Sequence, residues 1–308
     1  MSAMPLALVI TGPTASGKSA LAKEVATHLP IEIISADSAQ VYRGLDIGTA
    51  KPTQQERQET VHHLIDIRDP AEPYSAASFC QDAAPLAADI RRRNKVPMIV
   101  GGTMLYLKAL KHGLNDLPEA DAALRQEITD EANTKGWEEL HKELANIDPQ
   151  AAKRIQPNDP QRLQRAIEVY RLTGMTLSEL QAQPIKPPPI KLVELAIIPP
   201  DRTALHQKIA DRFHQMLASG FMEEVQQLYD RGDLNPSLAA IKSVGYRQAW
   251  AHLAGQMGLE TMAEQAIAAT RQLAKRQYTW LKSWQNLHQM AEPNCAQALK
   301  IIRAEGIL

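Results

Sequence analysis

Cysteine is nearly missing from this chain of 308 residues, which contains only Cys80 and Cys295. They stand far apart, neither belongs to a CxxC pair, and no paired histidines lie near them in the sequence. The sequence therefore indicates neither a disulfide framework nor a zinc or iron–sulfur site. Proteins without disulfides are typical of a reducing compartment, and we expect a cytoplasmic protein.

Long apolar runs are missing too, and aromatic residues make up only 5% of the chain. The longest apolar stretch, residues 4–10, is far shorter than the roughly 18 residues that a membrane-spanning helix needs. We therefore expect no signal peptide, no membrane span and no membrane partner. The hydrophobic share of 44% and the charged share of 22% are typical of a globular protein with a sizeable core.

An excess of charge of one sign is also absent, because 34 Lys and Arg residues balance 35 Asp and Glu residues. A net charge of -1 by itself argues against a nucleic-acid-binding protein. The charges are nevertheless segregated along the chain. Residues 116–148 contain ten acidic and three basic residues, whereas residues 151–191 and 265–291 each carry a net charge of about +4. This segregation predicts positive surfaces that the total charge conceals.

Strand-like and helix-like segments alternate in the first third of the chain. Residues 6–10 are continuously apolar and β-rich, which is typical of a strand buried on both faces, and residues 31–35 and 96–100 also have the pattern of strands. Helical patterns at residues 19–28 and 76–93 separate them, and a further strand is expected at 192–198. The pattern predicts the α/β class with a parallel sheet. Together with the phosphate-binding signature described below, it predicts a P-loop NTPase (nucleotide kinase-like) core. After residue 198 we expect only helices.

Residues 116–191 interrupt this alternation with helical periodicity alone. They close with a proline-rich linker at 184–189, in which a helix cannot continue. We therefore predict a helical insertion domain at 116–191 and a P-loop catalytic core at 1–115 and 192–308.

The signature GxxxxGK[ST] directly follows the first predicted strand and opens the first predicted helix. Backbone N–H groups of such a loop cradle a diphosphate, Lys18 adds a mobile positive charge, and the Ser19 hydroxyl can ligate Mg²⁺ as cofactor. The signature consists of Gly12, Pro13, Thr14, Ala15, Ser16, Gly17, Lys18 and Ser19.

The sequence gives two indications of which chemistry the phosphate loop serves. The strand at 96–100 ends in Gly101-Gly102-Thr103 rather than in the Asp that an ordinary P-loop ATPase uses to hold magnesium. Asp37 follows the second strand, so it should face the P-loop across the ligand crevice, where it can accept a proton from a nucleophile. The alternative for Asp37 is a helix N-cap. A small-metabolite kinase and another diphosphate-using transferase both remain open.

A basic helix is predicted within residues 265–291, which contain no acidic residue. Arg271, Lys275, Tyr278 and Lys282 should share one face, which suits a phosphate backbone with exposed bases. A solvated charged face is the alternative. We expect the packing face to carry Leu273, Ala274, Leu281 and Trp284.

Seven sequence blocks, spread in order over nearly the whole chain, resemble the bacterial tRNA dimethylallyltransferases, also called isopentenyl-diphosphate:tRNA transferases. The blocks are GPTASGKS at 12–19, DSAQVYR at 37–43, DIGTAKP at 46–52, GGTMLY at 101–106, DPQRLQRAIEVYRLTG at 159–174, VGYRQ at 244–248 and TRQLAKRQYTWL at 270–281. The eukaryotic relatives carry a C-terminal zinc finger, for which Cys295 has no partners, so the bacterial form fits better.

The resemblance implies an enzyme that transfers the dimethylallyl group from dimethylallyl diphosphate to N6 of the adenosine 3′-adjacent to the anticodon. This is position 37 in tRNAs that read codons beginning with U, and the products are N6-isopentenyladenosine and diphosphate. The partners are then dimethylallyl diphosphate and the tRNA anticodon stem-loop, which the insertion grips, and we expect a monomer without an obligate protein partner. The rivals are an adenylate isopentenyltransferase, a P-loop small-metabolite kinase and a non-catalytic P-loop protein that binds tRNA.

The resemblance also implies roles for individual residues. Thr14, Lys18 and Arg212 would neutralise the departing diphosphate, Ser19 would hold magnesium, and Asp37 would be the general base. The implied tRNA contacts are Asp37, Ser38, Ala39, Gln40, Thr103, Arg125, Gln161, Arg162, Leu163, Gln164, Arg165, Lys242, Ser243, Val244, Gly245, Tyr246, Arg247, Lys275, Arg276, Gln277, Tyr278, Thr279, Trp280, Leu281 and Lys282.

Overall fold

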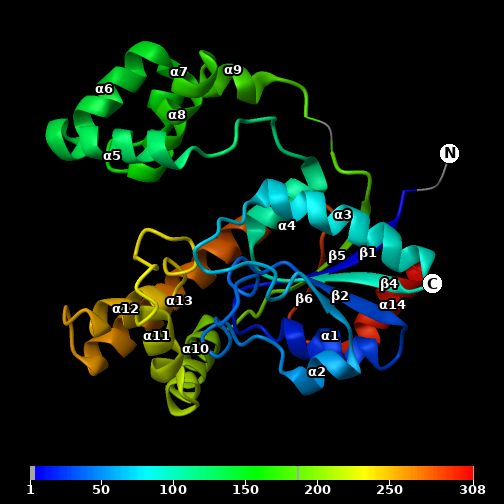
Figure 1. The fold of residues 1–308 in the computed structure, drawn as a ribbon. Coiled ribbons are helices and arrows are strands. Elements are labelled where there is room, and N and C mark those ends of the chain that lie inside the picture. Colours follow the sequence, from blue (N-terminus) through cyan, green and yellow to red (C-terminus); the bar gives the residue numbers. More distant parts are fainter. Residues whose placement is uncertain (1–3, 186, 308) are drawn as a thin grey trace. The chain divides into compact units, whose positions relative to one another are not determined.

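A parallel sheet forms the centre of the larger part of the chain (Figure 1). The computed structural model describes residues 4–185 and 187–307. Within them, six strands pair in the order β3-β2-β4-β1-β5-β6, and every pairing is parallel. The strands are β1 (Leu6–Thr11), β2 (Ile31–Ser35), β3 (His62–His63), β4 (Val96–Val100), β5 (Lys191–Ile197) and β6 (His288–Met290). The predicted α/β class and parallel sheet are confirmed.

The central strand β1 is apolar throughout because both of its faces are covered. Ala7 and Val9 belong to one core, and Leu8 and Ile10 belong to a second core on the other face. Helices α3 (Ala76–Arg92) and α4 (Met104–His112) contribute to the first core. Helices α1 (Lys18–Ala26) and α14 (Cys295–Ala304) contribute to the second (Figure 1). The alternation of side chains along a strand thus divides one apolar run between two helical layers.

The end of the chain differs from the prediction of helices alone. Helix α13 (Leu259–Lys282) ends at Lys282, and β6 then adds an edge strand beside β5. This strand has only three residues, so no alternation of side chains identifies it in the sequence. It forms because the β5 backbone offers it a ladder of hydrogen bonds. The two-residue strand β3 escapes sequence analysis for the same reason.

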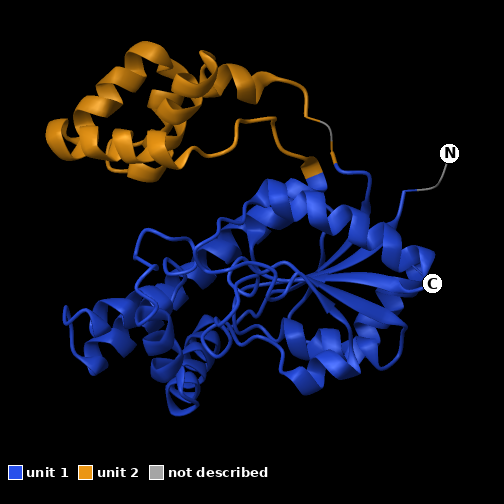
Figure 2. Cartoon of the chain, viewed as in Figure 1, with its two compact units in different colours: residues 1–111, 188–308 blue, residues 112–187 orange. Residues whose placement is uncertain are grey.

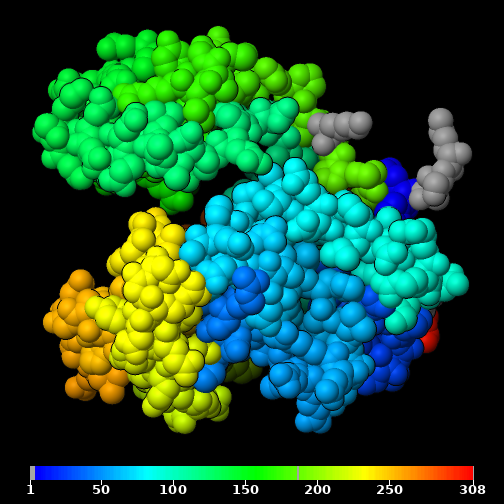
Figure 3. Space-filling view, in the orientation of Figure 1, coloured from blue at the N-terminus to red at the C-terminus, as the bar shows by residue number. Residues whose placement is uncertain are grey.

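Four helices extend the first core beyond the sheet: α10 (Arg202–Ala218), α11 (Phe221–Tyr229), α12 (Tyr246–Leu253) and α13. The rings of Phe213, Phe221 and Tyr246 stack edge to face at their centre. In the space-filling view, the yellow surface that includes α11 lies against the blue surface of earlier residues (Figure 3). Arg231 pairs with Asp69 between these segments, at 2.8 Å. A short helix, α2 (Gln54–Glu59), precedes β3.

The chain forms two compact units, residues 1–111 with 188–308, and residues 112–187 (Figure 2). The smaller unit contains α5 (Ala122–Lys135), α6 (Trp137–Ile147), α7 (Pro149–Arg154), α8 (Pro160–Thr173) and α9 (Leu177–Ala182). Its own core includes Ile128, Leu140, Leu144 and Ile167. Sequence analysis predicted an insertion at 116–191; Lys186 of its proline-rich linker lies outside the described residues. Every helix in the described ranges is too short or too polar to cross a membrane.

Candidate active site

A cavity of about 940 Å³ opens at the carboxyl ends of β1, β2 and β4, entirely within the larger unit. Its walls come from the P-loop, from the segments after β2 and β4, from residues 48–52 and 239–246, and from helices α10 and α13. This is the edge at which an open parallel sheet binds ligands, because the loops after its strands converge there. Most of the residues that sequence analysis predicted for the site line this cavity.

The P-loop takes a conformation that two glycines permit. Gly17 has a φ of +94° immediately before α1, and a Cβ on Gly12 would lie 2.4 Å from the Ile197 carbonyl oxygen of β5. The loop therefore rests directly on the neighbouring strand. The Lys18 Nζ donates a hydrogen bond to the Pro13 carbonyl at 2.7 Å, so the lysine folds back over its own loop.

The charges of Lys18, Asp37 and Arg212 influence one another across the cavity. Burial lowers the pKa of Lys18 to about 8, whereas Asp37 acts to raise it and Arg212 to lower it. Burial also lowers the pKa of Arg212, which α10 supplies, and Asp37 opposes that shift. Two cations therefore share a poorly solvated space with one carboxylate. An anion that entered between the cations would relieve their repulsion and their desolvation.

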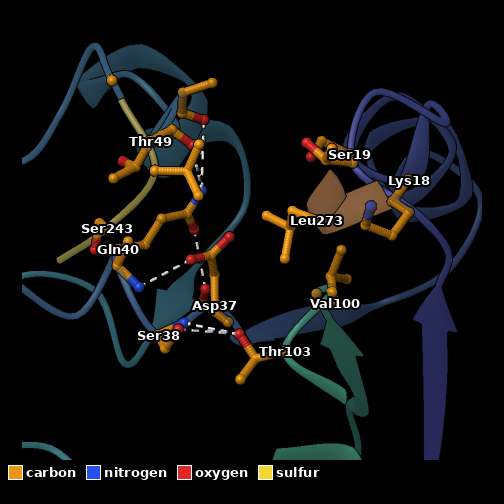
Figure 4. A pocket seen from close by; sticks show the side chains of 18 of the residues that line it. Lys18, Ser19, Asp37, Ser38, Gln40, Thr49, Val100, Thr103, Ser243 and Leu273 are labelled. Carbon is orange, nitrogen blue, oxygen red and sulfur yellow. Dashed lines mark hydrogen bonds between the residues drawn. The ribbon is translucent and has the colours of Figure 1, made fainter. Parts of the chain in front are cut away.

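Asp37 lies in a turn after β2, and no helix of the described chain begins there. Its Oδ1 accepts a hydrogen bond from the Ala39 backbone N–H at 2.9 Å, so the helix-cap alternative is wrong. The next residue, Ser38, donates its backbone N–H to the Thr103 Oγ1 at 3.0 Å. Figure 4 shows Asp37, Ser38 and Thr103 on one side of the cavity, and Lys18 and Ser19 on the other.

Directly after β4, the chain approaches the end of β2 so closely that residue 101 has no room for a side chain. A Cβ on Gly101 would lie 2.2 Å from the Ala36 carbonyl oxygen. An aspartate directly after β4, at position 101, therefore does not fit. The Ser19 hydroxyl, which is exposed at the first turn of α1 and lines the cavity, is a protein oxygen that suits magnesium. Since Mg²⁺ usually keeps several waters and binds substrate phosphates, one serine oxygen beside a phosphate cradle fits this ion.

The five predicted catalytic residues line this single cavity. They are Thr14, Lys18, Ser19, Asp37 and Arg212. The cavity wall also includes many of the predicted tRNA contacts, namely Ser38, Ala39, Gln40, Thr103, Lys242, Ser243, Val244, Gly245, Tyr246, Arg276, Gln277 and Trp280.

Several of the residues predicted to contact tRNA have buried side chains that already pack or bind within the protein. Leu163 lies in the core of the smaller unit, and Leu281 lies in the core of the larger one. Tyr246 is fully buried, and its hydroxyl donates to Glu224 Oε1 at 2.5 Å. Gln277 is 6% exposed and binds backbone groups on both sides.

The predicted faces of α13 also need correction. Tyr278 is not on an exposed basic face, because its ring is buried and its hydroxyl donates to the Pro199 carbonyl at 2.6 Å. Leu273, predicted for the packing face, projects instead into the cavity (Figure 4). Helix α13 packs against both α10 and α12. Its buried face is therefore wider than the predicted packing face and is rotated relative to it around the helix axis. Lys275, Arg276, Thr279 and Lys282 do face solvent.

In the smaller unit, most of the predicted cationic contacts serve a buried carboxylate. Arg125 donates from Nε to the Glu168 Oε1 at 2.8 Å, and Arg165 donates to its Oε2 at 2.6 Å. Glu168 is fully buried, and these pairs hold its pKa below the usual value against the opposing effect of burial. The Gln164 amide also binds inward, to the Arg125 carbonyl. Of this group, Gln161 and Arg162 are exposed, with Arg162 paired to Asp159.

Sequence analysis missed Glu224 of α11. Its carboxylate accepts the consecutive backbone N–H groups of Asp46, Ile47 and Gly48, at 2.7–3.1 Å, as well as the Tyr246 hydroxyl. It thereby fixes the loop that continues into residues 48–52 of the cavity wall. The segment FMEEVQQL reads as an ordinary amphipathic helix, so no sequence signal identifies this role.

The fold and the cavity together define an α/β protein with a P-loop-like core and a candidate anion site at the carboxyl edge of its sheet. A family model described as IPP transferase matches residues 40–284. A curated tRNA dimethylallyltransferase from Thioalkalivibrio sulfidiphilus (strain HL-EbGR7) is 55% identical over 303 residues, which are 97% of this chain and 95% of that protein. The chain therefore belongs to the IPP transferase family of tRNA dimethylallyltransferases, and it is a prenyltransferase enzyme. The resemblance found in the seven blocks is confirmed.

Solved structures agree with this assignment. The full-length tRNA isopentenylpyrophosphate transferase from Bacillus halodurans is 37% identical with a TM-score of 0.69, covering 98% of this chain and 94% of that one. The tRNA delta(2)-isopentenylpyrophosphate transferase from Staphylococcus epidermidis is 35% identical with a TM-score of 0.68, covering 98% of both chains. A eukaryotic dimethylallyltransferase acting on tRNA is 28% identical with a TM-score of 0.77, covering 96% of this chain and 77% of that one.

Proposed function

We propose that this enzyme transfers the dimethylallyl group from dimethylallyl diphosphate to N6 of the adenosine 3′-adjacent to the anticodon, position 37, in tRNAs that read codons beginning with U. The observation that carries the proposal is one cavity in which Lys18 and Arg212 face the carboxylate of Asp37. A leaving diphosphate needs the cations, and an amine nucleophile needs the base.

The P-loop side binds the diphosphate. Cleavage of the allylic C–O bond leaves its electron pair on the diphosphate, while positive charge develops on the dimethylallyl carbon. The loop N–H groups, Lys18 and Arg212 stabilise that negative charge, and because they are positioned in advance they act without reorganisation. Ser19 would hold magnesium, and the ion would supply further neutralisation of the negative charge on the diphosphate. Thr14 lines the same side of the cavity.

The Asp37 side activates the nucleophile. The exocyclic amine of adenine is weakly nucleophilic, so a carboxylate that accepts its proton as the N–C bond forms contributes about two to four orders of magnitude in rate. The Ala39 N–H holds one oxygen of Asp37, and the other is available for the amine. Thr103, tied to Ser38, would contact the same nucleotide.

In this proposal, exposed lysine and arginine side chains of both units bind the RNA. In the larger unit these are Lys242, Arg247, Lys275, Arg276 and Lys282, and in the smaller unit Arg162. We assign the helical insertion to the anticodon stem-loop. The target adenosine lies in a single-stranded loop, where turning a base out of its stack costs little. Because the proposed substrate occurs in the cytoplasm, we assign the enzyme to that compartment, acting as a monomer without an obligate protein partner.

The test is a transfer reaction with purified protein, dimethylallyl diphosphate, MgCl₂ and unmodified tRNA. We expect one C5H8 unit on the adenosine at position 37, detected by mass spectrometry of nuclease fragments. A parallel reaction contains AMP in place of tRNA. Product on AMP without product on tRNA would establish the adenylate isopentenyltransferase instead, and phosphoryl transfer from ATP to a metabolite would establish a kinase.

A further inference from the structure

Gln277 joins the two sides of the cavity from within α13. Its Oε1 accepts the Thr14 backbone N–H at 2.8 Å, and its Nε2 donates to the Gly102 carbonyl at 2.8 Å. An N–H group can only donate and a carbonyl can only accept, so these two partners determine the orientation of the amide. The side chain is buried although Arg276 beside it faces solvent.

The second of these bonds leads to the segment that carries Asp37. Gly102 precedes Thr103, whose backbone N–H donates to the Ala36 carbonyl at 3.2 Å and whose Oγ1 accepts the Ser38 N–H at 3.0 Å. Asp37 lies between these two anchored residues. A continuous chain of hydrogen bonds and covalent bonds therefore runs from the P-loop through Gln277 to the proposed base.

Gln277 can make these two hydrogen bonds only because residue 102 has no side chain. A Cβ on Gly102 would lie 2.5 Å from the Gln277 Nε2. A glutamine at 277 and a glycine at 102 are therefore sterically dependent on each other, although 175 positions separate them.

We propose that Gln277 is a positioning residue for prenyl transfer, an inference that rests on the proposed function. It fixes the separation between the P-loop, which holds the diphosphate, and the Asp37 segment, which receives the amine. Reacting groups that must meet within a few tenths of an ångström lose rate steeply when one side shifts. Gln277 is thus not an RNA contact, and its loss should change turnover rather than RNA affinity.

The experiment compares Gln277→Met, which keeps the length of the side chain but removes both hydrogen bonds, with Gln272→Met. Gln272 is exposed on the same helix and serves as the matched control. We expect Gln277→Met to lower kcat at least about tenfold while the Kd of an anticodon stem-loop RNA stays within about twofold. Gln272→Met should change neither. A raised Kd with normal kcat would show direct RNA contact and overturn the inference.

Gly102→Ala provides a second, independent variant. Its methyl group should displace the Gln277 amide without altering α13, so kcat should fall with RNA affinity retained. If Gln277→Met does not fold, as judged by its thermal unfolding, Gly102→Ala decides the question; normal turnover in Gly102→Ala would contradict the inference. When both variants fold, their effects on kcat should not add, because each breaks the same bridge. An inactive wild-type enzyme would instead overturn the proposed function.

Discussion

Replacing Glu224 with Gln should destabilise the larger unit strongly while leaving its shape almost unchanged. The carboxylate accepts four hydrogen bonds: Oε2 takes the N–H groups of Asp46 and Ile47, and Oε1 takes that of Gly48 and the Tyr246 hydroxyl. A glutamine amide has only one acceptor oxygen. Whichever way the amide turns, its NH₂ group faces at least one backbone N–H that needs an acceptor.

The magnitude follows from these contacts. In the better orientation the amide oxygen keeps Asp46 and Ile47, and the Gly48 N–H is left without a partner, at a cost of about 1–3 kcal/mol. The two retained bonds change from charge-assisted to neutral, and each weakens by about 1 kcal/mol. The free energy of unfolding should therefore fall by about 3–5 kcal/mol in total.

Urea unfolding monitored by tryptophan fluorescence measures this change, with Glu223→Gln as the control. Glu223 is the exposed neighbour of Glu224 on α11, and its replacement should alter the free energy of unfolding by less than about 0.5 kcal/mol. Equal m-values would show that the two variants unfold over the same surface. If Glu224→Gln and Glu223→Gln shifted the midpoint equally, the carboxylate would not hold the loop as described.

Further predictions concern the site itself. Asp37→Ala should lower turnover at least about a hundredfold with magnesium pyrophosphate binding retained; near-normal turnover would exclude Asp37 as the base. Because burial lowers the pKa of Lys18 to about 8, the affinity for magnesium pyrophosphate should decline above about pH 8, whereas Lys18→Met should bind weakly with no such decline. Between about pH 8 and the ordinary lysine pKa of 10.5, Lys18 is largely deprotonated in the folded state but protonated in the unfolded state. The free energy of unfolding should therefore rise with pH in this range, because the unfolded state binds more protons. Lys18→Met should remove that rise. The pair Lys275→Ala and Lys282→Ala should weaken RNA binding and flatten its salt dependence; an unchanged slope would show that these lysines do not meet phosphates.

The sequence was sufficient wherever the relevant residues are neighbours in the chain. The P-loop is one contiguous turn between a strand and a helix, and Asp37 follows a strand whose end must face that turn, so both could be placed without a structure. The α/β class followed from the alternation of buried strands and helices. The order of the strands in the sheet could not be predicted from the sequence. It depends on which strand edges are still unpaired when each crossover connection returns to the sheet.

The remaining differences arise from packing between distant segments. Arg125 has the appearance of a free cation in the sequence, yet its partner Glu168 lies 43 positions further on. Tyr246 and Gln277 fit the pattern of an exposed recognition segment, but their polar groups are already bound to Glu224 and to backbone atoms. Charge and polarity identify what a side chain can bind, whereas only the tertiary structure shows whether it is already bound.

The pairing of β1 with β5 has a consequence for synthesis on the ribosome. These two strands form the longest register in the sheet, from Leu6 with Lys191 to Thr11 with Ala196, yet the chain between them includes the whole of unit 112–187. Until that unit has been translated, one edge of β1 has no partner strand. Closing a longer connection costs only about 0.6 kcal/mol for each doubling of its length. The inserted unit can therefore lengthen or shorten during evolution with little thermodynamic effect on the core, while its length sets how long β1 must wait for its second partner strand.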